Sequence, residues 1–233
     1  MTSQSAAIEN PQRQSFLRDL SLLLLIPAVS TFYNQLNHAG RGAHSLMTDL
    51  DRAIPVIEAF VLPYLAWYGF ILIAFVYLCR KDRTSYYQTL VSTIIGLLVS
   101  YTIYFFYQTT VPRPVLTGHD VFTVLLQYVY STDQPYNCFP SIHVLTSYLI
   151  LRGFKGRRQL PRFVRGAVWL MSVMIIVSTL FVKQHVLMDV LGAIVLSELI
   201  RSVVKIFIPD VTKEADPTWQ PKPYSWSTTR RKL

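Results

Sequence analysis

Charged residues are scarce in this sequence. They make up only 15% of its 233 residues, whereas 52% are hydrophobic. Soluble domains average about 25% charged residues, so the composition argues against a chain that folds wholly in water. The shortage is also concentrated, because long stretches carry no charge at all. Such stretches indicate a lipid bilayer as the surroundings, and we expect one integral membrane domain over residues 1–208.

Cysteine is rarer still, with only Cys79 and Cys138 in the chain. Two cysteines exclude a disulfide framework, and the topology argued below puts them on opposite membrane faces. The net charge of +9 does not indicate nucleic acid as a partner, because the basic residues lie between the apolar segments. That placement is typical of cytoplasmic loops beside anionic lipid headgroups.

The apolar segments predict an all-α fold, a six-helix transmembrane bundle. Each segment approaches the ~20 residues that a helix needs to cross a bilayer, although the fourth is short and contains a histidine. The expected spans are Phe16–Asn34, Ile54–Cys79, Tyr86–Tyr107, Phe139–Phe154, Val164–Val182 and His185–Ile208. The first also resembles a secretory signal peptide, with basic residues before an apolar core and small residues after it. We expect it to be a retained helix.

The distribution of lysine and arginine predicts the orientation. The loop after the second span contains Arg80, Lys81 and Arg83, and the third and fifth connections contain only Arg113 and Lys183. The loop after the fourth span holds six basic residues and no acid: Arg152, Lys155, Arg157, Arg158, Arg162 and Arg165. The positive-inside rule therefore predicts a multi-pass protein of the cell membrane with cytoplasmic termini. Residues 209–233 are expected to form a basic, disordered cytoplasmic tail.

Three short stretches with chemically reactive side chains all fall on the outward side: Val111–Pro114, Phe139–His143 and Lys183–Asp189. In the last of these, the spacing of His185 and Asp189 puts both on one face if the stretch is helical. Helical side chains lean toward the N-terminus, which tips Asp189 toward the His185 ring. A carboxylate on Nδ1–H leaves Nε2 free as a nucleophile. The simpler reading is a polar pair at a helix end, but ionisable residues near a membrane interior are usually functional.

The second stretch, Phe139–His143, opens the fourth span. Pro140 suits the first turn of a helix, where its missing N–H leaves no partner unpaired. Free backbone N–H groups there attract anions. Ser141 adds a hydroxyl donor for a phosphate oxygen, and His143 is placed to act as general acid. In isolation a histidine at a helix start is more often a cap or a surface residue.

The first stretch, Val111–Pro114, places Arg113 between two prolines that stiffen the backbone. A guanidinium suits bidentate phosphate binding, and Lys183 offers a second cation. Alone, Arg113 would more often pair with lipid headgroups. The active-site hypothesis therefore depends on all three stretches sharing the extracytoplasmic membrane interface.

Together the three stretches resemble a known family. Arg113-Pro114, then Pro140–His143, then Ser178 through His185 to Asp189 are similar to the ordered signature motifs of the type 2 phosphatidic acid phosphatase superfamily. That superfamily includes lipid phosphatases, undecaprenyl-diphosphate phosphatases and vanadium haloperoxidases. The resemblance implies that His185 is the nucleophile, Asp189 its orienting partner and His143 the acid, with Arg113 and Ser141 holding phosphate.

The sequence departs from the family pattern at three positions. Phe106 stands where the family has lysine, Ile142 where it usually has glycine, and Thr179 where it has arginine. Two phosphate-binding cations are therefore missing, and Lys183 is a candidate to replace one. The sequence patterns Phe-Pro-Ser-x-His and Lys-Gln-His-x-x-x-Asp resemble those of the branch that contains inositol-phosphorylceramide-synthase-like proteins. That branch transfers a phospho-headgroup.

The expected function is a lipid phosphatase that needs no cofactor and takes a lipid phosphate substrate from the membrane. Phospho-headgroup transfer at the same site stays open, because it differs only in what reaches the intermediate. A silent family member, a transporter and a haloperoxidase are weaker alternatives. A His/His/Asp zinc site is conceivable by residue type, but the nearby Arg113 and Lys183 oppose a cation.

Overall fold

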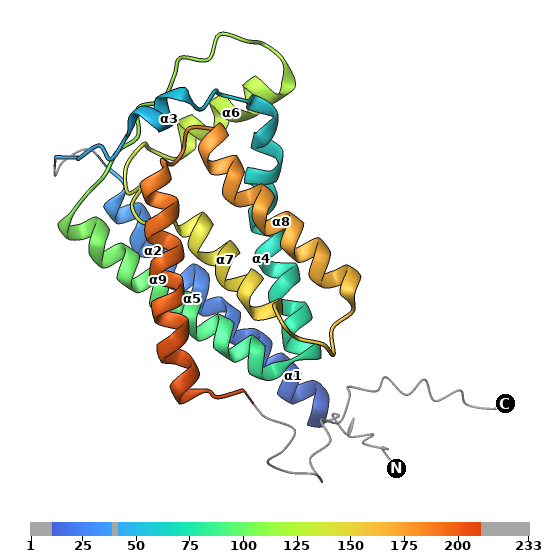
Figure 1. Ribbon diagram of the computed structural model, residues 1–233. Coiled ribbons are helices and arrows are strands. Elements are labelled where there is room, and N and C mark those ends of the chain that lie inside the picture. The colour runs from blue at the N-terminus through green and yellow to red at the C-terminus, as the bar shows by residue number, and fades with distance from the viewer. Residues whose placement is uncertain (1–10, 39–41, 211–233) are drawn as a thin grey trace, which may run out of the picture.

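The computed structural model describes residues 11–38 and 42–210, and this part of the chain is helical. It contains no strand within those ranges, only the isolated bridges His44–Thr109 and Thr110–Tyr136. The all-α prediction is confirmed there (Figure 1). The helices are α1 (Pro11–Ser21), η1 (Leu22–Leu24), α2 (Leu25–Leu36), α3 (Asp49–Ala53), η2 (Glu58–Phe60), α4 (Val61–Lys81), α5 (Arg83–Phe106), α6 (Val121–Thr132), α7 (Ile142–Phe154), α8 (Arg162–Phe181) and α9 (Leu187–Phe207).

Four helical segments are long and apolar enough to cross a membrane. They are Gln14–Leu36, Glu58–Lys81, Arg83–Phe106 and Arg162–Phe181, between 20 and 24 residues in length. At 1.5 Å per residue each reaches about 30 Å or more, the thickness of a bilayer's hydrocarbon core. These segments correspond to the first, second, third and fifth predicted spans, and they support location in a membrane.

The other two predicted spans differ from expectation. The fourth begins at Ile142 rather than Phe139, and its 13 residues extend only about 20 Å. The sixth begins at Leu187 and has 21 residues, but four of them are charged: Asp189, Glu198, Arg201 and Lys205. The six-helix transmembrane bundle therefore stays a prediction.

Helix α7 is short because it lies inside the bundle. Figure 1 shows it surrounded by α4, α5, α8 and α9, and it packs against each of them. Its apolar residues Val144, Leu145 and Leu149 are buried with Val190 and Ala193 of α9. An interior helix does not need to reach both membrane surfaces, because its neighbours shield it from lipid.

The two ends of the bundle carry different elements. One end holds α3, α6 and the first residues of α7 and α9; the other holds the C-terminal ends of α4, α7 and α9 (Figure 1). We call these the α3 end and the basic end, the latter after the loop 152–165. The chain direction of α9 therefore places its Asp189 at the α3 end. From residue 211 onward the predicted tail lies outside the described residues.

Candidate active site

His185 and Asp189 meet as predicted, but for a different structural reason. His185 precedes α9 rather than lying on it, and Asp189 is the third helical residue. The chain turns after α8 through Lys183, whose φ is +52°. The N–H groups of Gln184 and His185 both donate to the Thr179 carbonyl, at 3.0 and 3.1 Å. This turn, and not a shared helical face, brings His185 Nδ1 to 3.2 Å from Asp189 Oδ2.

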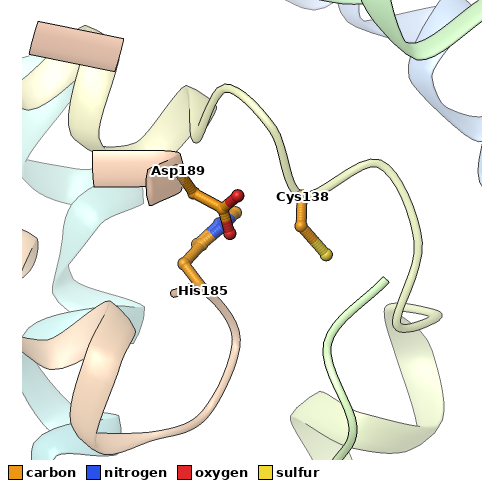
Figure 2. Close-up of side chains that lie close together, drawn as sticks. All are labelled: Cys138, His185 and Asp189. Carbon is orange, nitrogen blue, oxygen red and sulfur yellow. The ribbon is translucent and has the colours of Figure 1, made fainter. Parts of the chain in front are cut away.

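The Asp189 carboxylate is held in place. It is fully buried, and Oδ2 also accepts the Val186 N–H at 2.9 Å, which caps the start of α9. An acid in the first helical turn is favoured by the helix dipole. Figure 2 shows the His185 ring beside this carboxylate. Because a carboxylate oxygen accepts only, a neutral ring would donate through Nδ1, and within the described residues no hydrogen bond is made to its Nε2.

His143 lies across from His185, with the ring centroids 6.0 Å apart. Tyr64 of α4 stacks on it at a centroid distance of 4.5 Å, and Trp67 of α4 packs against it in a tilted arrangement at 4.2 Å. Both ring nitrogens are buried and have no hydrogen-bond partner within the described ranges. A buried polar atom without a partner is costly, so His143 is a ring held by packing and available to a ligand.

Ser141 caps α7 and links two of the stretches. Its Oγ accepts the Val144 N–H at 3.3 Å, and its own N–H donates to the Asp189 carbonyl at 3.3 Å. Pro140 therefore precedes the cap, which corrects its expected position in the first helical turn. The Ser141 hydroxyl hydrogen is still available for a phosphate oxygen.

The Arg113 guanidinium is fixed by three acceptors. Nη1 donates to the carbonyls of Tyr130 and Asp133 at 3.1 and 2.5 Å, and Nη2 donates to Gln184 Oε1 at 2.6 Å. It also lies over the Tyr130 ring, 4.7 Å from the centroid. Arg113 is thereby joined to the residue that precedes His185. Its Nε is buried without a partner among the described residues.

The Lys183 ammonium points toward the segment around α3. Its Nζ donates to the Asp51 and Ile54 carbonyls at 2.8 and 2.5 Å. No contact in the described part of the chain joins its ammonium to His185 or Asp189. Two of its three N–H donors thus hold the loop against the segment around α3, and one is left for phosphate.

The order and spacing of these residues agree with an independent comparison. A family model described as the PAP2 superfamily matches residues 43–201, well over half of the chain. The chain belongs to the PAP2 superfamily. Comparisons with curated proteins and with solved structures gave no match. Membership suggests a phosphatase-type lipid phosphoesterase, and the matched range contains every residue of the predicted site.

The PAP2 chain has a further site residue that sequence reasoning missed. Asp51 of α3 is buried, and its Oδ1 accepts the Leu187 N–H at 2.8 Å. Burial alone would raise the pKa of Asp51, but hydrogen bonds from Thr48 and Leu187 outweigh it and lower that pKa. The Thr48–Asp51 capping box is readable in the sequence. Its contact with the His185 loop is not, because the two segments lie far apart in the chain.

One group of metal-type donors occurs in the described residues of this PAP2 protein: Cys138, His185 and Asp189, with ligand atoms within 4.8 Å of one another (Figure 2). It contains Cys138 in place of His143, unlike the His/His/Asp set considered above. Burial, then the Asp189 charge, raises the pKa of the Cys138 thiol. The donor types suit zinc, although binding would require the thiol to lose its proton.

Proposed function

We propose that this PAP2-superfamily protein is a membrane-embedded phosphatase that hydrolyses a lipid phosphate through a phosphohistidine at His185. One observation carries the proposal: His185 Nδ1 lies 3.2 Å from the buried Asp189 carboxylate, and the ring faces His143, whose nitrogens are unpartnered in the described structure. The pair supports a nucleophile of fixed tautomer, and His143 supports an acid–base group beside it.

In the first step, His185 Nε2 attacks phosphorus. The P–N bond forms as the bond from phosphorus to the lipid oxygen breaks, and protonated His143 gives its proton to the departing oxygen. The negative charge of the bound phosphate favours that protonated form. Asp189 stabilises the positive charge that develops on the His185 ring. Arg113 and the Ser141 hydroxyl stabilise the phosphoryl oxygens.

In the second step, water attacks phosphorus from the position vacated by the lipid alcohol. Neutral His143 accepts a proton from this water, the P–N bond breaks, and inorganic phosphate leaves. Both histidines return to their starting states, so the cycle needs no cofactor. The 6.0 Å separation of the rings supports their action on one phosphoryl group.

The substrate would come from the bilayer. Family membership and the four long apolar helical segments support a lipid phosphate that enters sideways. The site residues lie at the α3 end, where the sequence has few basic residues, so we assign this end to the extracytoplasmic interface.

Transfer of a phospho-headgroup to an acceptor alcohol is the second candidate. Burial favours it, since His143 and His185 are only 7% and 8% exposed. A closed site limits attack by bulk water and favours attack by an alcohol that is bound beside the intermediate. The two activities share the first step and differ only in the acceptor.

The test is release of phosphate from a panel of lipid phosphates by detergent-purified protein in EDTA. We expect release by the intact chain, none by His185→Ala or His143→Ala, and normal release by His119→Ala, which removes an exposed histidine. Acid-labile labelling from a ³²P-lipid, present in His119→Ala and absent from His185→Ala, would identify the intermediate.

Each outcome of this assay points to one reading. Phosphate release that survives in His185→Ala would overturn the mechanism. Labelling without release, relieved by added alcohols, would favour transfer. No labelling and no release from any lipid would leave a silent family member or a transporter.

A further inference from the structure

A cavity of about 300 Å³ lies at the basic end of the bundle, away from the histidines. It opens between the C-terminal end of α7 and the first half of α8. Three cationic side chains line it, Arg152, Lys155 and Arg165, together with the aromatic rings of Tyr148 and Trp169. No acidic side chain is among its lining residues. Its chemistry is therefore that of an anion site.

The three cations are not equally neutralised. Arg152 pairs with Glu198 at 2.6 Å, and Tyr148 donates to the same carboxylate at 2.7 Å. Lys155 and Arg165 form no ion pair with any described residue, and the buried Arg165 Nε has no hydrogen-bond partner there. Within residues 11–38 and 42–210, two cations at this cavity thus have no counter-charge. A ligand with negative charge would supply it.

The surroundings of the cavity indicate a lipid rather than a soluble anion. Trp169 and Leu170 are each 56% exposed and Phe163 is 80% exposed, and all lie on α8, one of the four long apolar segments. An exposed apolar face on such a helix suits acyl chains. Tryptophan beside cations is typical of the headgroup level of a membrane.

We propose that this cavity binds the phosphate of an anionic phospholipid, held by Lys155 and Arg165, with its acyl chains along Trp169 and the exposed face of α8. Basic pockets between membrane helices are known headgroup sites. The site is separate from His185 and does not depend on the reaction there. It would anchor the α7–α8 connection to one class of lipid.

The chain itself offers a matched control. Arg158 and Arg162 belong to the same loop and are exposed, but neither lines the cavity. The double variants Lys155→Glu/Arg165→Glu and Arg158→Glu/Arg162→Glu change the loop charge equally. Binding of short-chain phosphatidylglycerol and phosphatidylcholine to the full chain in neutral detergent would be measured by native mass spectrometry, with glycerol phosphate as the soluble competitor.

We expect the first double variant to bind phosphatidylglycerol about tenfold or more weakly, since each lost cation weakens headgroup attraction. The second should bind within about twofold of the unmodified chain. Equal losses in the two variants, or equal binding of phosphatidylcholine, would overturn the proposal. Full displacement of phosphatidylglycerol by glycerol phosphate would show that the cavity binds a soluble phosphate and would overturn the assignment to a lipid. If the Glu variant is not monodisperse, Lys155→Gln/Arg165→Gln decides with the same criteria.

Discussion

The α3 end and the basic end of the bundle both contain acidic and basic side chains, but the charged residues that define each end differ in burial. At the α3 end, Asp51 and Asp189 are buried and each accepts a backbone N–H at the start of α9. At the basic end, Arg158 and Arg162 are exposed and Arg152 shares a partly exposed Glu198. Burying an ion requires that its partners be fixed, whereas exposed pairs contribute little. The comparison shows that buried polar groups set precise geometry, while exposed ones set surface charge.

Asp189→Asn and Glu198→Gln give the largest expected contrast, because each removes one charge from α9: Asp189 beside His185 in the first turn, and Glu198 beside Arg152 further along the helix. Asn keeps the shape of Asp189 but its amide can present N–H to the His185 ring and invert the tautomer, so we expect kcat/KM to fall about 10³-fold or more. Glu198→Gln should change it less than about threefold. Steady-state phosphate release measures both. Similar losses at both ends would remove the distinction.

Arg113→Ala and Arg152→Ala compare two arginines. Arg113 is fixed beside the His185 loop through Gln184, so its removal should lower kcat/KM about 10²-fold, as for other lost oxyanion donors. Arg152→Ala should leave the same quantity within about threefold. Arg113→Lys separates charge from the guanidinium fork: recovery of most activity would show that charge alone matters.

Asp51→Asn and Asp82→Asn compare two aspartates that accept a backbone N–H at a helix start, from Leu187 and Ser85 respectively. Asn can still accept the N–H, but each variant loses a negative charge at a helix N-terminus and should lower the free energy of unfolding by about 0.5 kcal/mol. Only Asp51→Asn should also lower kcat, by about tenfold, because it supports the His185 loop. Equal kcat in both variants would make Asp51 purely structural.

The stabilisation that Asp51 provides depends on pH. The lowered pKa of Asp51 means that its stabilisation is complete above the unfolded-state pKa and is lost as pH falls through the lower folded-state pKa. Thermal unfolding of the intact chain should therefore lose this increment at acid pH, and Asp51→Asn should not.

Lys183→Ala and Lys205→Ala test the role of Lys183. Its two bonds to carbonyls near α3 lead us to expect a melting temperature lower by about 2–4 °C and a KM within about threefold. Lys205, paired with Asp210 at 2.7 Å, should change neither. A KM for lipid phosphate raised tenfold in Lys183→Ala would restore the sequence-based role in phosphate binding.

Cys138→Ala and Cys79→Ala have the smallest expected effect on activity. Neither thiol takes part in the proposed steps, so both variants should release phosphate within about twofold of the intact chain, with or without EDTA. Added zinc should inhibit the intact chain and Cys79→Ala more than Cys138→Ala, because only Cys138 adds a third donor to His185 and Asp189. Activity that EDTA abolishes and zinc restores would replace the metal-free mechanism.

Local sequence patterns were sufficient to predict most of the long helices and the family. Apolar runs predict four of the long helical segments, and the order of three polar stretches predicts the family. The contact of Trp67 with His143 was not predictable, because it depends on how α4 packs against α7. Lys183 shows the same limit: its place in the motif suggests phosphate binding, whereas the turn at positive φ directs its ammonium to carbonyls near α3.

The sequence by itself determined the helical, membrane-type composition, the superfamily and the choice of candidate site residues. These follow from composition, periodicity and spacing, which act over short stretches of chain. Only the tertiary structure decided that His185 meets Asp189 across a turn, that Asp51 supports that turn, and that α7 is an interior helix. Those contacts join segments far apart in the chain, and they arise from the burial of helix faces and the need to pair every buried polar group.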